Sequence, residues 1–140
     1  MPLSAGTIFR LWFDEVWNQR DASRIATYFA PDGIAYAADL HGADVHGPAA
    51  FRAFFEQFLQ SFSDVHFTVE DVWELGNKAA GRWTLRLTHS GDGFGFTASG
   101  VTAKVTGMTM IRVEDGMIVE GWNQWDRMRL ASACGMVKPA

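Results

Sequence analysis

The residues best suited to chemistry lie near the C-terminus, in an extended segment that runs from the turn at 114–116 to the carboxylate of Asp126. Side chains of a strand alternate between its two faces. Trp122 and Asp126 are therefore expected on one face, and Asn123 and Trp125 on the other. Poor solvation beside indole surface would favour the protonated form of a carboxylate, which suits a residue that donates and accepts protons. The spacing makes Asp126 the first candidate for acid–base catalysis.

Asp126 has a second interpretation. Residues 127–135 are typical of a short helix that ends at Gly135. Aspartate is a preferred residue immediately before a helix, and glycine a preferred residue immediately after one. Capping and catalysis both remain open for Asp126 at this point.

Two further strands carry candidate residues. Residues 78–89 place Arg82, Thr84 and Arg86 on one face and Trp83, Leu85 and Leu87 on the other. A polar face of this kind either lines a cavity, where Arg82 would orient Asp126, or faces solvent; the residues alone favour solvent. Methionines adapt to irregular apolar shapes. Met108 and Met110 would therefore suit the wall of an apolar pocket or an ordinary core, with Arg112 nearer the mouth of that pocket.

The order of elements predicts an α+β fold. Helical spacing is expected in three segments of the first half, and strands in one early and four later segments; the helices are 7–17, 22–29 and 48–62, and the strands 33–37, 65–75, 78–89, 102–113 and 117–126. Helices gathered on one face of a curved antiparallel sheet would enclose a pocket. The length suits a single domain over residues 1–140.

Composition restricts the possible partners. The formal net charge is −4 and no basic stripe is present, so nucleic-acid binding is not expected. The single cysteine, Cys134, excludes an intrachain disulfide, and the four histidines lack the spacing of a metal site. No apolar run is long enough to span a membrane. His41 lies in a polar loop, as a pocket base or as a solvent-exposed residue.

Several short motifs in order resemble the SnoaL-like polyketide cyclase family of the nuclear transport factor 2-like superfamily. The motifs are Val16–Asp21, Phe29–Asp32, His46–Arg52, Phe67–Val72, Arg82–Thr84 and Glu114–Trp122. The resemblance covers residues 8–130 and implies a cone-shaped sheet with three N-terminal helices around a pocket. It favours placing Arg82 inside that pocket.

The resemblance also implies site residues. An aspartate at the end of the last strand acts as acid and base in such cyclases, and Asp126 has the matching place. Arg112 stands where they carry a histidine, and an arginine cannot shuttle a proton. The chain is also similar to limonene-1,2-epoxide hydrolases, whose Asp-Arg-Asp arrangement would correspond to Asp126, Arg82 and a threonine, Thr84. The resemblance to these hydrolases further suggests Tyr36 as a pocket residue.

We therefore predict a cofactor-free acid–base enzyme acting on an apolar, oxygenated small molecule by aldol cyclisation or isomerisation. An epoxide hydrolase and a non-catalytic binding protein are the alternatives. Asp126 and Arg82 are the predicted catalytic residues, and the predicted binding residues are Tyr36, His41, Thr84, Met108, Met110, Arg112 and Trp122. We expect a cytoplasmic homodimer, associated through an outer sheet face that carries Trp73, Trp83 and Trp125.

Overall fold

The structure is a computed structural model and describes residues 2–136. Its helical half comprises α1 (Ala5–Leu11), the π-helix η1 (Trp12–Asn18), the 3₁₀-helix η2 (Ala22–Arg24), α2 (Ile25–Tyr28) and α3 (Gly47–Ser61). Local side chains explain several of the boundaries. The hydroxyl of Ser4 accepts from the backbone N–H of Thr7 at the start of α1, and Pro48 occupies the first turn of α3.

Six strands form one curved sheet in the order β2-β1-β6-β5-β4-β3. The strands are β1 (Phe29–Tyr36), β2 (Val45–His46), β3 (Phe62–Leu75), β4 (Lys78–His89), β5 (Thr102–Glu114) and β6 (Met117–Trp125), and the helix α4 (Arg127–Ala133) follows them. The predicted α+β fold with a curved sheet is confirmed, but the sheet is mixed, because β1 pairs with β6 in parallel while the other pairs are antiparallel. The predicted helix over 22–29 is shorter than expected, since β1 already begins at Phe29.

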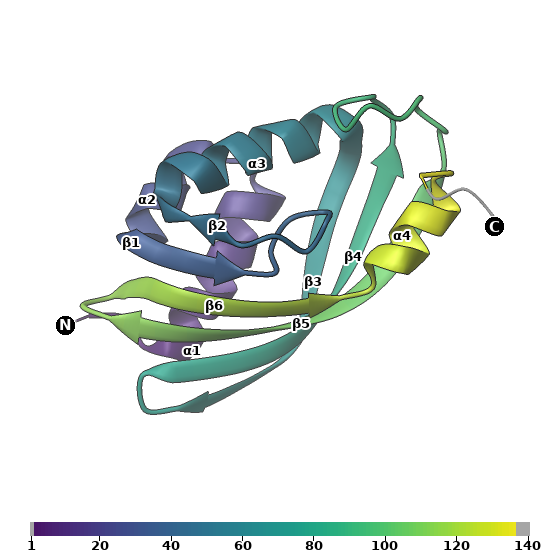
Figure 1. Ribbon diagram of the computed structural model, residues 1–140. Coiled ribbons are helices and arrows are strands. Elements are labelled where there is room, and N and C mark those ends of the chain that lie inside the picture. The colour runs from purple at the N-terminus through teal and green to yellow at the C-terminus, as the bar shows by residue number, and fades with distance from the viewer. Residues whose placement is uncertain (1, 137–140) are drawn as a thin grey trace.

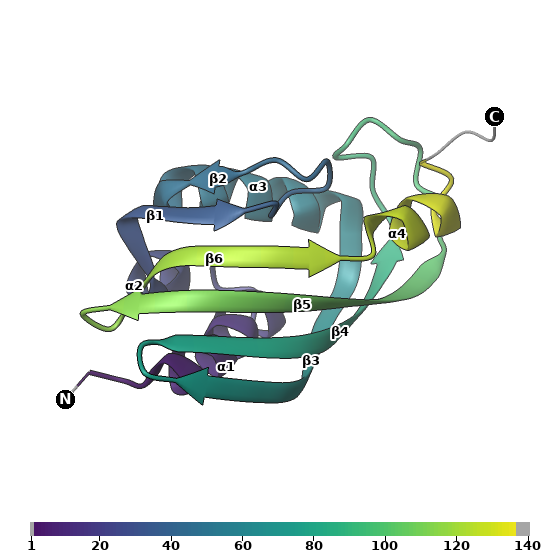
Figure 2. The same ribbon diagram turned by 60° about the horizontal axis from the view of Figure 1, so that its bottom comes forward.

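The helices α1, α2 and α3 all cover one face of the sheet, and α4 lies at the end of β6 (Figures 1 and 2). We call the helix-covered face the inner face and the opposite one the outer face. On β4, Trp83, Leu85 and Leu87 are buried against the helices, whereas Arg82 and Arg86 are exposed. The same alternation buries Thr109 and Ile111 on β5. The core therefore lies between the inner face and the helices.

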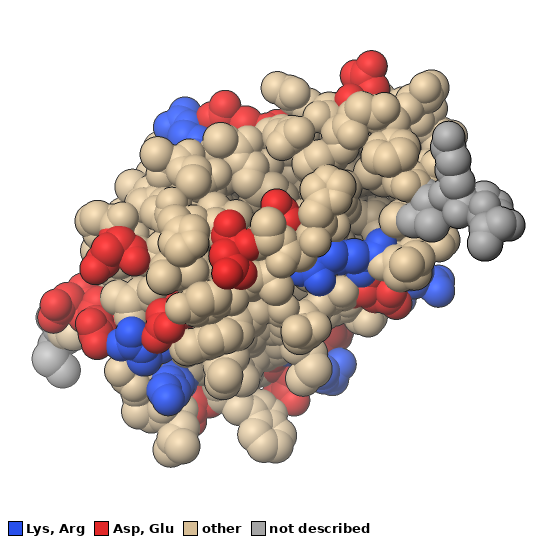
Figure 3. Space-filling view, viewed as in Figure 1, with Lys and Arg blue, Asp and Glu red and all other residues tan. Residues whose placement is uncertain are grey.

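Charged side chains of both signs are interspersed with uncharged residues on the face shown in Figure 3. Blue and red groups alternate there, and no continuous cationic stripe crosses this view. Within residues 2–136, no helix is long and apolar enough to cross a membrane.

Candidate functional site

Two adjoining cavities of about 60 and 30 Å³ lie between the inner face and the helices. Trp12, Phe13 and Asn123 border both of them. The larger cavity is otherwise lined by aromatic and aliphatic groups: Trp17, Ala38, Phe51, Phe54, Phe58, Phe67, Trp83, Leu85 and Trp125. Such concave apolar walls with few polar groups are typical of small-molecule sites.

The π-helix η1 directs the aromatic residues of the cavity wall. Its wider turns are closed by hydrogen bonds over five residues, from Gln19 N–H to the Asp14 carbonyl (2.9 Å) and from Asp21 N–H to the Val16 carbonyl (3.1 Å). π-Helical turns are uncommon and occur frequently at functional sites. This one allows Trp12, Phe13, Val16 and Trp17 all to be buried in the core.

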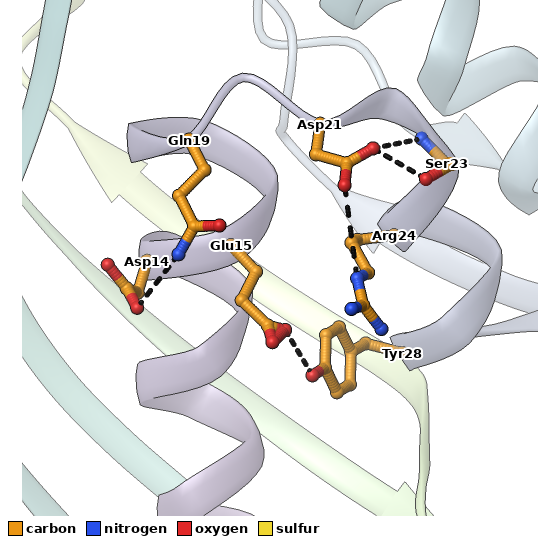
Figure 4. A network of polar contacts seen from close by, with 7 residues as sticks. All are labelled: Asp14, Glu15, Gln19, Asp21, Ser23, Arg24 and Tyr28. Carbon is orange, nitrogen blue, oxygen red and sulfur yellow. Dashed lines mark hydrogen bonds and ion pairs between the residues drawn. The ribbon is translucent and has the colours of Figure 1, made fainter.

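Polar contacts hold η1 in place at both sides. The Asn18 amide donates to the Phe67 carbonyl (2.9 Å) and accepts from the Phe67 N–H (2.7 Å), which pins the helix to β3. On the other side, the Tyr28 hydroxyl donates to Glu15 at 2.5 Å (Figure 4). Burial, followed by this hydrogen bond, raises the pKa of Tyr28, so the phenol stays protonated and remains a donor. These contacts preorganise the wall from which Trp12 and Trp17 project.

A short hydrogen-bonded chain supplies the polar groups of the cavities. Trp83 Nε1 donates to Thr109 Oγ1 (3.0 Å), and the Thr109 hydroxyl donates to Asn123 Oδ1 (2.9 Å). Asn123 Nδ2 in turn donates to the backbone carbonyl of Tyr36 (2.9 Å). Thr109 and Asn123 are direct partners across β5 and β6, which explains why the inner face brings them together.

Gly107 makes room for the two indoles of the inner face. A Cβ at this position would overlap the ring of Trp83 and lie 2.7 Å from Cβ of Trp125. The Trp83 ring can therefore lie over β5 only because residue 107 has no side chain. In that position Trp83 packs against Phe67, with ring centroids 5.0 Å apart.

The edge of the larger cavity includes Ala38, in the loop after β1, and the half-buried Phe54 of α3. Arg127 of α4 fastens this loop. Its Nε donates to the Asp39 carbonyl (2.9 Å), its Nη2 donates to the Ala37 carbonyl, and its guanidinium lies 5.0 Å from the centroid of the Trp125 ring. Burial lowers the pKa of Arg127. The guanidinium of Arg127 thus joins α4 to the loop after β1 and to the cavity-lining indole of Trp125.

The glycine-containing connection between β4 and β5, residues 90–101, packs over the end of α3 (Figure 1). Gln57 Nε2 donates to the Gly93 carbonyl (3.0 Å), and the N–H groups of Ser90 and Gly91 both donate to the Ser61 carbonyl (3.0 Å). Phe94 lies 6.4 Å, centroid to centroid, from Phe58, which lines the larger cavity. This connection therefore supports the cavity wall from behind.

Asp126 is exposed at the start of α4, and its side chain accepts from Arg129 N–H at 3.0 Å. The capping interpretation of Asp126 is confirmed. Its side chain does not border either inner cavity. The helices cover the face opposite to the one that Trp122 and Asp126 share, so Asp126 lies outside the helix-enclosed cavities.

The same reversal applies to β4 and β5. Arg82 is exposed on the outer face, and the hydroxyl of Thr84 donates there to Glu70 (3.1 Å). Met108 and Met110 are 62% and 43% exposed. Neither methionine borders the helix-covered cavities. Four predicted site residues nevertheless lie together around an open groove of about 560 Å³ at the outer side of the sheet: Arg82, Thr84, Met108 and Asp126. The solvated-face interpretation of Arg82, which the alternation alone favours, is the one that the structure shows.

The remaining predicted binding residues also lie outside the cavities. Tyr36 stacks on Trp122 across the outer face, with ring centroids 5.8 Å apart, and its hydroxyl donates to Glu120 (3.0 Å). Arg112 also binds Glu120, at 2.8 Å. His41 is exposed in the loop after β1. Only the backbone carbonyl of Tyr36 takes part in the inner site, as the acceptor for Asn123.

The outer aromatic face differs from its prediction as well. Trp83 is buried and Trp125 half-buried on the inner side, whereas Trp73 is 75% exposed on the outer face. Register places Trp73, Ala80, Met110, Trp122 and Tyr36 in one row across five strands. We call these five residues the outer apolar row.

The inner cavities offer apolar surface and hydrogen bonds. Their lining residues include no acid, histidine, lysine or arginine. Residues 2–136 contain no cluster of histidine, cysteine or acidic residues that could hold a metal ion. Neither Thr109 nor Asn123 was predicted as a site residue. The alternation along residues 117–126 places Asn123 on the same face as Trp125. A large aromatic side chain on that face is the signal that could have indicated that Asn123 points inward.

A family model for SnoaL-like polyketide cyclases matches residues 7–134. A candidate SnoaL-like polyketide cyclase from Jannaschia sp. CCS1 superposes with a TM-score of 0.82 at 20% identity, covering 94% of this chain and 92% of that one. IdmH, a candidate polyketide cyclase of Streptomyces antibioticus, gives 0.79 at 25% identity, over 94% and 98%.

A third protein, from Catenulispora acidiphila, has a ketosteroid isomerase-like fold and was crystallised with trimethylamine. It superposes with a TM-score of 0.79 at 16% identity, over 97% of this chain and 100% of that one. A comparison with curated protein sequences found no match. The α+β architecture is thus that of nuclear transport factor 2-like proteins. Because the family model matches nearly the whole chain, residues 7–134, the chain belongs to the SnoaL-like polyketide cyclase family.

Proposed function

We propose that this protein is a small-molecule cyclase or isomerase whose substrate, an apolar oxygenated compound, binds in the aromatic cavity. The observation that carries the proposal is the cavity itself, with aromatic walls and a single carboxamide, in a member of the SnoaL-like family. Aromatic and aliphatic walls favour a carbon skeleton of low polarity. Asn123 supplies a directional contact to one oxygen of that skeleton.

The arrangement is suited to catalysis by orientation. A flexible substrate held between the wall of η1 and the inner face would be restricted to few conformations, which favours ring closure. A hydrogen bond from Asn123 Nδ2 would stabilise negative charge that develops on a carbonyl oxygen. Protons would have to move through the substrate or through water, because the lining residues include no titratable side chain.

Ligand entry requires the cavity to widen. Its volume of about 60 Å³ is well below the roughly 300 Å³ of typical drug-sized sites. Phe54 and Phe58 of α3 are the wall residues next to the cavity edge and to the 90–101 connection. We expect their rings to turn outward when a ligand binds, with Phe94 moving away from Phe58.

A non-catalytic binding protein is the second candidate, and the absence of titratable groups from the cavity lining favours it specifically. The epoxide hydrolase alternative receives less support, since its acid pair would have to line the cavity and the corresponding residues, Asp126 and Thr84, lie on the outer side.

The deciding experiment is a thermal-shift screen of aromatic polyketides, terpene epoxides and steroids, followed by product analysis for each compound that binds. Binding with conversion to an isomer or a cyclised product supports the enzyme. Binding without conversion supports a non-catalytic binding protein. If no compound of the three classes raises the melting temperature, the proposal of a small-molecule site is wrong.

We also propose that the protein forms a homodimer through the outer apolar row. Trp73 and Met110 of this row, with the neighbouring Met108, expose much of their apolar surface to solvent. Charges of both signs flank the row, with Arg82 opposite Asp71 on one side and Arg112 opposite Glu120 on the other, so a second copy could pair opposite charges. Sedimentation of wild type and Trp73→Glu tests this; a wild-type monomer would refute it.

A further inference from the structure

The direction of the hydrogen-bonded chain in the cavity is fixed at both ends. The indole N–H of Trp83 can only donate, and the backbone carbonyl of Tyr36 can only accept. Thr109 Oγ1 accepts from Trp83 at 3.0 Å, so its own proton is left for Asn123 Oδ1 at 2.9 Å. Nδ2 of the same amide then donates to the Tyr36 carbonyl at 2.9 Å. The oxygen and nitrogen of the Asn123 amide therefore cannot exchange places without breaking the chain.

This fixed orientation leaves one amide N–H without a partner among residues 2–136. An amide nitrogen carries two hydrogens, and only one contact of Nδ2 is made, to Tyr36. Asn123 borders both cavities, so this N–H belongs to a group on the wall of the site. Buried N–H groups without a partner are rare in proteins, because an unsatisfied donor costs the free energy of its desolvation.

We infer that Thr109 is a positioning residue, which holds the Asn123 amide so that the cavity selects a neutral ligand carrying a hydrogen-bond-accepting oxygen, such as a ketone or an ether. Neutrality follows from the lining, which offers no cation to compensate a buried anion. A hydrocarbon of the same shape would leave the N–H unpaired. This inference rests on the proposed function only in that the ligand must occupy the aromatic cavity.

The test compares 1-tetralone with tetralin, which share a bicyclic skeleton and differ by one carbonyl oxygen. Dissociation constants are measured by calorimetry and by quenching of the cavity tryptophans. For the wild type we expect 1-tetralone to bind about two- to tenfold more tightly, the range that corresponds to one net hydrogen bond. Thr109→Val should reduce this ratio to about one, whereas Thr109→Ser should retain it.

A merely structural role of Thr109 would weaken both compounds equally and leave their ratio intact, which would overturn the inference. Should Thr109→Val fail to fold, Asn123→Leu provides the same test, since it removes the donor and keeps the branching at Cγ. An unchanged ratio in that variant also overturns the inference. If the wild type binds tetralin and 1-tetralone equally, selection by an acceptor oxygen is wrong and the cavity remains a ligand site. If it binds neither, the proposed function fails together with the inference.

Discussion

Replacing Asp126 distinguishes its capping role from a chemical one, because two substitutions have opposite consequences in the two cases. Asparagine caps a helix about as well as aspartate but cannot transfer a proton, whereas alanine does neither. In the structure, Asp126 accepts from Arg129 N–H at 3.0 Å and is exposed. We therefore expect Asp126→Ala to lower stability, and Asp126→Asn to change stability little and activity not at all.

The magnitude follows from the contacts of α4. Loss of a side-chain cap costs about 1 kcal/mol, with a range of roughly 0.5–2 kcal/mol. The loss should reach the global free energy of unfolding, because Leu130 of α4 is fully buried in the core and Arg129 Nε donates to the Lys104 carbonyl at 3.0 Å. For a domain of this size the expected decrease in melting temperature is about 3 °C. Asparagine should cost less than about 0.5 kcal/mol, since it retains the acceptor and loses only the charge near the helix N-terminus.

The assay is urea denaturation of wild type, Asp126→Ala and Asp126→Asn, together with the rate of product formation from a compound identified by the ligand screen. Equal stability of all three proteins would refute the capping argument. Loss of turnover in Asp126→Asn, with substrate binding intact, would show instead that the exposed carboxylate takes part in the reaction.

Three further predictions concern the cavity and the outer face. Gly107→Ala should displace the ring of Trp83 and lower the free energy of unfolding by about 1–3 kcal/mol, as overpacking of a core does. Near-ultraviolet circular dichroism should report the altered environment of the indole, and an unchanged spectrum and unfolding curve would contradict this. Arg127→Lys should loosen the loop at the cavity edge, since one ammonium cannot reproduce the guanidinium contacts to two carbonyls, and hydrogen exchange should increase in residues 37–44 and not in β4. A hydrogen bond from Arg112 holds the pKa of Glu120 below its ordinary value of 4.5. The ionised Glu120 therefore stabilises the fold above pH 4.5, and this stabilisation is lost as the pH falls through the lowered pKa. Denaturation at pH 7 and pH 3 should show a smaller acid-induced loss of stability in Arg112→Gln than in the wild type, and an equal loss would contradict the pairing.

Much of the secondary structure follows from the sequence because local patterns determine it. The strand over 78–89 is confirmed to the residue, since strict alternation and the turn before Lys78 define it. The helix of residues 48–62 is confirmed within one residue at each end, because Pro48 and the phenylalanine stripe identify it. The parallel pairing of β1 with β6 was not predictable from local pattern, since it joins strands separated by most of the chain.

The residues predicted to line an enclosed pocket lie on the outer face of the sheet, and the reason differs between strands. On β4 the alternation alone favoured the correct face, with Trp83 inside and Arg82 in solvent, and the family resemblance reversed that preference. On β5 the composition itself misleads, because the exposed residues include Met108 and Met110 while the inner ones include Gly107 and Thr109.

The sequence by itself determined the α+β class, the strand over 78–89 and the helix of residues 48–62, all of which depend on neighbouring residues and on periodicity. It offered the helix cap at Asp126 as one of two interpretations. Only the tertiary structure decided which face of the sheet encloses the cavity. Gly107 lies on the inner face, where the ring of Trp83 from the neighbouring strand occupies the space that a side chain would fill. Likewise, Thr109 and Asn123 become a polar site only where β5 pairs with β6 and the helices close over them. A strand pattern specifies two faces, and the packing of distant elements chooses between them.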